Sequence, residues 1–90
     1  MKWIIKISSK AENYFEKLNK ELQNRLKEKI IDLSNYDNPI LHKDVKSLTG
    51  QLKGFYRLRI GGYRVVFSLL SNEKIIAIVN IAPRGDVYKK

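Results

Sequence analysis

The chain contains no cysteine and only one histidine among its 90 residues. Disulfide scaffolds and thiolate metal sites are therefore excluded, and a reducing cytoplasm is the expected location. The acidic residues lack metal-ligand spacing and no glycine-rich phosphate loop opens a helix, so we expect no metal and no other cofactor. The apolar run Trp3-Ile4-Ile5 is too short, and too soon followed by Lys6, to be a signal peptide or a membrane span.

Acidic residues are also scarce: the chain has nine of them and eighteen lysines and arginines, which gives a formal net charge of +9. Such an excess attracts polyanions at long range. Nucleic acid, an acidic protein and an anionic membrane surface are all compatible partners, and a merely solvated lysine-rich surface is the plainer alternative. Hydrophobic residues make up 43% of the chain. This is enough for one modest core, so we expect a single domain over residues 1–90.

The first half of the chain predicts a strand followed by two helices. Residues 2–7 are rich in β-branched and aromatic types, which favour a strand. Ser9 and Glu12 have the spacing of a capping box, which predicts a helix with the Ser9 hydroxyl as its N-cap. Asn19 can cap a second helix, which should end at the turn-forming residues 35–39. Both helices are predicted to be apolar on one face (Ala11, Tyr14, Phe15 and Leu18 in the first; Leu22, Leu26, Ile30 and Leu33 in the second).

The second half predicts three strands, over residues 52–60, 63–70 and 74–82. Gly61-Gly62 fits the two-residue loop of a hairpin, where positive φ angles are common. The resulting order is βααβββ, an α+β fold. We expect an N-terminal helical hairpin packed on one face of a twisted, mostly antiparallel four-stranded sheet.

The hairpin register predicts a basic face. If Gly61-Gly62 is the loop, Arg59 pairs with Arg64, and alternation places Arg57 on the same face. Like charges in a cross-strand pair cost up to about 1 kcal/mol. Arginine forks suit phosphate oxygens, so we interpret the face as an exposed anion site, although an outer sheet face needs polar residues in any case. With Ile81 expected opposite Arg64, Arg84 would approach the same arginines, and Tyr88 would follow within reach.

An arginine-rich cleft suits transesterification in RNA, in which the 2′-hydroxyl attacks its own phosphate. Guanidinium groups can orient the RNA and neutralise the charge that grows on the phosphate. Proton transfer is the weak point, because arginine stays protonated. His42 lies far from the arginines in sequence and is expected to be a solvated loop residue. Tyr88 or a lysine would therefore have to move the proton.

Two motifs resemble those of the RelE/ParE toxin superfamily. One is the segment from Val45 to Phe67, with its Tyr-Arg-Leu-Arg strand, glycine turn and Tyr-Arg-Val; the other is the Pro83–Lys89 ending, which resembles RelE toxins of archaeal type. The resemblance spans nearly the whole chain and implies a RelE-like fold. For a RelE-type toxin it implies a ribosome-dependent endoribonuclease that cleaves messenger RNA in the A site.

The resemblance also assigns roles to individual residues. Arg64 would stabilise the scissile phosphate, Arg84 the transition state or leaving group, and Tyr88 would stack on or orient the base. Basic residues would contact the RNA and the ribosome (Arg57, Arg59, Lys46, Lys53 and Lys89). Arg57 and Arg59 stand where some members have lysines, which disfavours a lysine base there.

The same resemblance implies a type II toxin–antitoxin system, with a cognate acidic antitoxin that folds on binding, and with the ribosome and messenger RNA as the other partners. No membrane and no small-molecule cofactor are implied. Two other functions stay open. ParE-type members inhibit DNA gyrase on the same fold, and the chain could also be a nuclease-inactive module that binds RNA or antitoxin.

Overall fold

The computed structural model describes residues 2–83. Strand β1 (Ile4–Ile7) leads into helix α1 (Ser9–Glu16), and helix α2 (Lys20–Ser34) follows. Asn19 caps α2 as expected, because its side chain accepts a hydrogen bond from the backbone N–H of Leu22 at 2.9 Å. The expected N-cap of α1 is wrong by one residue. Ser8, rather than Ser9, is the N-cap, and its Oγ accepts a bond from the N–H of Ala11 at 3.1 Å.

The position of Ser8 in the sheet explains this difference. The Ser8 N–H donates to the carbonyl of Ile78 at 2.9 Å, and its hydroxyl lies 3.2 Å from the carbonyl of Val79. Ser8 therefore stays in extended backbone beside the last strand and the helix begins after it. Sequence spacing could not choose between two adjacent serines, because both can cap a helix.

The sheet has five strands rather than the expected four. The additional strand is β2 (Val45–Ser47), which pairs antiparallel with β3 (Tyr56–Ile60); β4 (Tyr63–Leu70) and β5 (Ile75–Pro83) complete the sheet. The strand order is β1-β5-β4-β3-β2, and only the β1–β5 pairing is parallel. Two short 3-10 helices, η1 (Pro39–Leu41) and η2 (Gly50–Leu52), flank β2. The α+β class and the mostly antiparallel sheet are confirmed.

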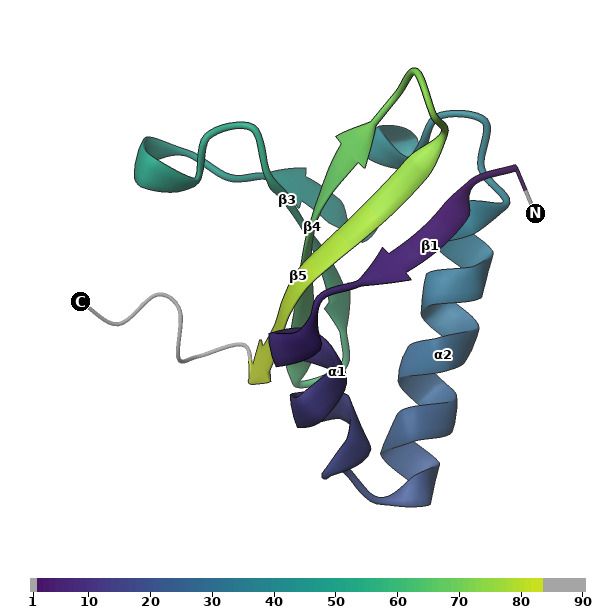
Figure 1. Cartoon of the computed structure of the whole chain (residues 1–90), viewed down its shortest axis with the longest axis vertical. Helices are drawn as coiled ribbons and strands as arrows, with labels where there is room; N and C mark the ends of the chain where they lie inside the picture. The colour runs from purple at the N-terminus through teal and green to yellow at the C-terminus, as the bar shows by residue number, and fades with distance from the viewer. Residues whose placement is uncertain (1, 84–90) are drawn as a thin grey trace.

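Both helices cover one face of this sheet, and the core lies between them (Figure 1). Leu26, Ile30 and Leu33 of α2 are buried, as their spacing predicted. Tyr56 and Phe67 stack across β3 and β4 with ring centroids 5.7 Å apart. The buried cluster on the sheet side comes from alternate residues of the strands (Leu58, Ile60, Val65, Phe67, Ile76, Ile78 and Ile81). The opposite face of the sheet is thereby left to the arginines.

A β-bulge interrupts the pairing of β4 with β5. From Leu70 to Phe67 the register is the expected one, but Val66 then pairs with Asn80 instead of Val79. Arg64 consequently lies opposite Ala82, and the expected pairing of Arg64 with Ile81 is wrong. The shift places Ile81 in the core, where it is buried, and keeps Asn80 out of it. Burying Ile81 instead of an amide is the physical gain from the bulge.

No helix among residues 2–83 is long and apolar enough to cross a membrane.

Candidate nucleic-acid interface

The expected cross-strand arginine pair is present. The β3–β4 hairpin pairs Ile60 with Tyr63 and Arg59 with Arg64 around the Gly61-Gly62 turn. Gly61 has a φ of 57°, in the left-handed region that favours glycine. The additional strand β2 creates a second like-charge pair, because Lys46 lies opposite Arg57. Two such pairs on one face each cost stability, which a purely structural sheet has no reason to carry.

Arg64 was expected to be exposed, but its side chain does not lie on the surface. It is fully buried, with 0% of its area exposed, and Val66 on the same face is buried too. Both residues belong to β4, which has a neighbouring strand on each side. Side chains on such a central strand keep less access to solvent than those nearer an edge. The prediction of three exposed arginines is therefore wrong for Arg64.

The accessible part of the basic face lies on β3 and β2. Arg59 has 47% of its side chain exposed, Lys46 is exposed and Arg57 is partly buried. Lys53 is exposed at the end of η2, in a segment that extends away from the sheet (teal in Figure 1). Arg84, Tyr88 and Lys89 lie outside the described residues, so their expected roles stay predictions.

The structure brings an acidic residue to this face that the sequence did not single out. Asp44 directly precedes β2, and its Oδ1 lies 3.6 Å from Nη2 of Arg59. Its Oδ2 lies 3.1 Å from Nζ of Lys29 on α2. The hydrogen bond from Lys29 lowers the pKa of Asp44, against a smaller opposing effect of burial. A carboxyl with a lowered pKa is a weak proton acceptor, so Asp44 is poorly suited to be a general base.

His42 is not solvated, contrary to expectation. Its side chain is buried, and its Nδ1 accepts a hydrogen bond from the backbone N–H of Asp44 at 3.0 Å. Its Nε2 lies 3.1 Å from Oδ2 of Asp32 on α2, and its ring lies 4.8 Å from that of Tyr36. The expectation was wrong because the residues around His42 favour turns, whereas its partners Asp32 and Tyr36 belong to α2 and the segment after it.

Two further cations from α2 reach this end of the sheet. Lys29 reaches it by its ion pair with Asp44. Arg25 reaches the hairpin turn, where its Nη1 lies 3.6 Å from the position that a Cβ would take at Gly61. Both residues lie off the apolar stripe of α2, where they could be read only as solvated charges. Their approach to the strands depends on how the helix packs on the sheet, which helical spacing does not reveal.

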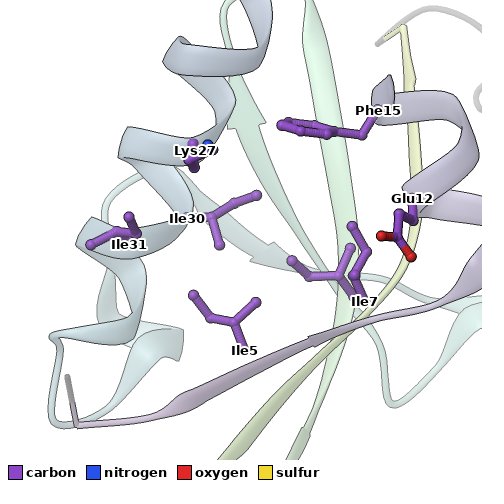
Figure 2. A pocket seen from close by; sticks show the side chains of 8 residues that line it. Ile5, Ile7, Glu12, Phe15, Lys27, Ile30 and Ile31 are labelled. Carbon is purple, nitrogen blue, oxygen red and sulfur yellow. The ribbon is translucent and has the colours of Figure 1, made fainter. Parts of the chain in front are cut away.

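A second, apolar surface lies on the other side of the sheet. A groove of about 230 Å³ opens between β1 and the two helices, as Figure 2 shows. Ile31 and Ile7 on its walls are 43% and 37% exposed. Polar residues border it at Glu12 and Lys27, and the remaining lining is hydrophobic (Ile5, Phe15, Ile30 and Ile78). The groove is therefore suited to an apolar partner and is separate from the basic face.

The basic face can bind anions through guanidinium and ammonium groups. Arg59 and Arg57 supply planar forks of N–H donors, and Lys46 supplies a mobile point charge. Within residues 2–83 no three His, Cys, Asp or Glu side chains gather in a way that could hold a metal ion.

Known proteins share both the sequence pattern and the fold of this chain. Residues 5–88 match the sequence profile of a family described as the ParE toxin of the type II toxin–antitoxin system parDE. No curated protein sequence matches the chain. Among solved structures, RelE in the archaeal RelE–RelB complex from Pyrococcus horikoshii is 32% identical, with a TM-score of 0.76 over 94% of this chain and 98% of that one.

Two more solved complexes share the fold at lower identity. The toxin–antitoxin complex RelBE2 from Mycobacterium tuberculosis contains a chain with a TM-score of 0.79 and 20% identity, covering 93% of this chain and 100% of that one. A chain of the intact E. coli RelBE complex has a TM-score of 0.72 and 14% identity, covering 90% of this chain and 95% of that one.

Proposed function

Because the chain belongs to the ParE toxin family of type II toxin–antitoxin systems, within the RelE/ParE superfamily, we propose that it is a ribosome-dependent endoribonuclease that cleaves messenger RNA in the A site. The basic face carries the proposal. Its two like-charge cross-strand pairs, Arg59 with Arg64 and Lys46 with Arg57, cost folding stability and are compensated when a polyanion binds. The site of action would be the cytoplasm.

The proposed chemistry is attack of a ribose 2′-hydroxyl on the adjacent phosphate, with departure of the 5′-oxygen. The exposed fork of Arg59 would contact a non-bridging phosphate oxygen, and Arg64 directly opposite adds positive potential from within the sheet. Arg57, Lys46 and Lys53 would hold the flanking backbone. Arg84 is proposed to stabilise the leaving group, Tyr88 to orient the base and Lys89 to add a backbone contact.

Dependence on the ribosome follows from the weak proton transfer in this arrangement. Asp44 has a lowered pKa, and His42 is buried with both ring nitrogens in contact with neighbouring residues. Without a strong base among these groups, rate must come from holding the RNA in line for attack. A ribosome that presents an ordered codon would supply that alignment, so free RNA should be cut slowly.

The partner that restrains the toxin is proposed to be an acidic antitoxin. The archaeal RelE relative was solved in complex with RelB. The net charge of +9 would speed the capture of an acidic chain. The groove between β1 and the helices could receive the apolar side of an amphipathic segment, with an acidic residue meeting Lys27 (Figure 2).

Mapping RNA 5′ ends after induction of the toxin tests the proposed activity. We expect new ends within translated codons, in a fixed position relative to the reading frame. The rival function is inhibition of DNA gyrase, which the ParE description of the matched family favours. Intact messages together with gyrase arrested on DNA would overturn the nuclease proposal in favour of that function.

A further inference from the structure

Asp44 touches three cationic side chains with three different oxygen atoms. Its Oδ2 accepts from Lys29 at 3.1 Å, its Oδ1 lies 3.6 Å from Nη2 of Arg59, and its backbone carbonyl accepts from Nη1 of Arg57 at 3.1 Å. The same carbonyl also accepts the backbone N–H of Arg59 at 3.0 Å. One residue at the entrance of β2 therefore contacts both arginines of β3.

The placement of Asp44 is itself constrained. Its backbone N–H donates to Nδ1 of His42, and a backbone N–H can only donate, so Nδ1 carries no proton. The ring proton is therefore on Nε2, which faces Oδ2 of Asp32 at 3.1 Å. Burial of His42 removes water as an alternative partner. The chain Asp32–His42–Asp44 connects α2 to the arginines of the sheet.

The contacts differ in what they do to each arginine. The backbone carbonyl orients Arg57 but carries no net charge, so the charge of Arg57 remains available to a phosphate. The β2–β3 register continues one residue beyond Val45, so Asp44 lies beside Arg59, which in turn lies beside Arg64. The negative Asp44 carboxylate therefore faces the first of two neighbouring positive side chains. An arginine side chain loses rotamer entropy when it is held in one geometry, so orienting it before the substrate arrives lowers the entropy cost of binding.

We propose that Asp44 is a positioning residue of the RNA site, which orients Arg57 and Arg59 and restrains their mutual repulsion before RNA binds. The inference rests on the proposed nuclease function and adds a residue that its basic pattern did not include. Asp44 acts through the arginines and does not contact the reacting atoms. Removal of the Asp44 carboxylate should therefore slow RNA cleavage without weakening RNA binding.

The Asp44→Asn variant isolates the carboxylate, because it keeps the backbone carbonyl for Arg57 and the backbone N–H for His42. It also removes a negative charge beside the site, which favours binding of a polyanion. We expect Asp44→Asn to bind programmed ribosomes at least as tightly as the wild type. We expect it to cleave at least about tenfold more slowly, since misplaced groups can cost up to about a hundredfold.

The test uses two forms of one message on purified ribosomes. A message with 2′-O-methyl groups in the A-site codon lacks the nucleophile and reports binding, and the unmodified message reports the rate of single-turnover cleavage. Asp37→Asn is the matched control, because it changes net charge equally, while Asp37 pairs with Lys2 and is 87% exposed. Wild-type binding and cleavage are expected for this control. Asp44→Glu, which restores the charge, should recover part of the rate.

Three results would overturn the proposal. Asp44→Asn could cleave at the wild-type rate, or it could lose binding in proportion to rate, as a damaged fold would. It could also leave the arginines equally ordered, which nitrogen-15 relaxation of the Nε–H groups of Arg57 and Arg59 measures without RNA. We expect lower order in the variant. If the wild type cuts no message, the nuclease function fails, and this relaxation measurement still decides whether Asp44 orients the arginines.

Discussion

At the scale of residues, the basic face combines accessible and buried cations. Arg59 is about half exposed, whereas Arg64 opposite it is fully buried. A buried guanidinium is costly to remove by truncation, because truncation leaves a cavity as well as removing the charge. Substitutions that keep the volume therefore give the clearest information on Arg64.

Arg64→Met is expected to abolish growth arrest while shifting the thermal midpoint by only a few degrees. Methionine fills most of the arginine volume, and hydrophobic replacement of a buried charge is often close to neutral for stability. Colony formation after induction, measured beside the thermal midpoint, checks this. Lys6→Met is the control, because Lys6 is exposed on β1 at the far edge of the sheet. Arrest that persists in Arg64→Met would remove Arg64 from the site.

Asp44 should also mark the acid limit of stability. Its pKa is lowered chiefly by the hydrogen bond from Lys29, so its ionised form is favoured in the folded protein. That stabilisation is complete above the ordinary aspartate pKa of about 3.9 and is lost as pH falls through the lower folded value. The thermal midpoints of wild type and Asp44→Asn should therefore differ at pH 6 and converge as the pH falls through the lowered pKa of Asp44. A constant difference at every pH would contradict this.

At the scale of elements, the bulge in β5 decides which of its residues enter the core. The three buried isoleucines of β5 are Ile76, Ile78 and Ile81, whose spacing changes from two to three across Val79. Strict alternation would have turned Asn80 inward. Ser8, the N-cap of α1, contacts the bulge, because its hydroxyl lies 3.2 Å from the carbonyl of Val79.

Ile81→Ala is expected to lower the free energy of unfolding by about 2 to 5 kcal/mol, as large-to-small changes in cores do. Asn80→Ala should cost less than about 1 kcal/mol, because Asn80 faces away from the core. Urea denaturation of the two variants measures both values. The reverse ranking would mean that β5 follows the unbulged register.

At the scale of the whole molecule, the sheet separates two surfaces of different chemistry. The helix side carries the apolar groove of Figure 2, and the other side carries the arginines. The proposed RNA site and the proposed antitoxin site therefore lie on separate surfaces. An antitoxin anchored in the groove could therefore capture the toxin without first displacing RNA.

Ile31→Asp is expected to weaken neutralisation by the proposed antitoxin. Ile31 is 43% exposed on the wall of the groove, and a carboxylate there both loses apolar contact and repels an acidic partner. Leu70→Asp, at a residue 46% exposed outside the groove, is the control. Growth rescue by co-expression and the association rate of the two proteins are measured. Equal rescue of both variants would place the antitoxin elsewhere, and association that does not slow with salt would exclude charge steering.

Much of this protein could be predicted from local sequence. The Asn19 cap, the apolar stripe of α2 and the Gly61-Gly62 hairpin each depend on residues close together in the chain, and all are present. The pairing of Arg59 with Arg64 follows from the hairpin alone. Local hydrogen bonding and side-chain alternation set these features, so the sequence by itself determined the α+β class and the face on which the arginines lie.

The remaining features were decided by contacts between distant segments. Arg64 is buried on the central strand β4, and the strand β2 forms by pairing with β3 across the η2 segment. His42 and Asp44 acquire their partners only when α2 packs against the sheet, because Asp32 and Lys29 both come from that helix. Sequence spacing reports which residues share an element, whereas the tertiary structure alone decides which elements meet and which charges they bring together.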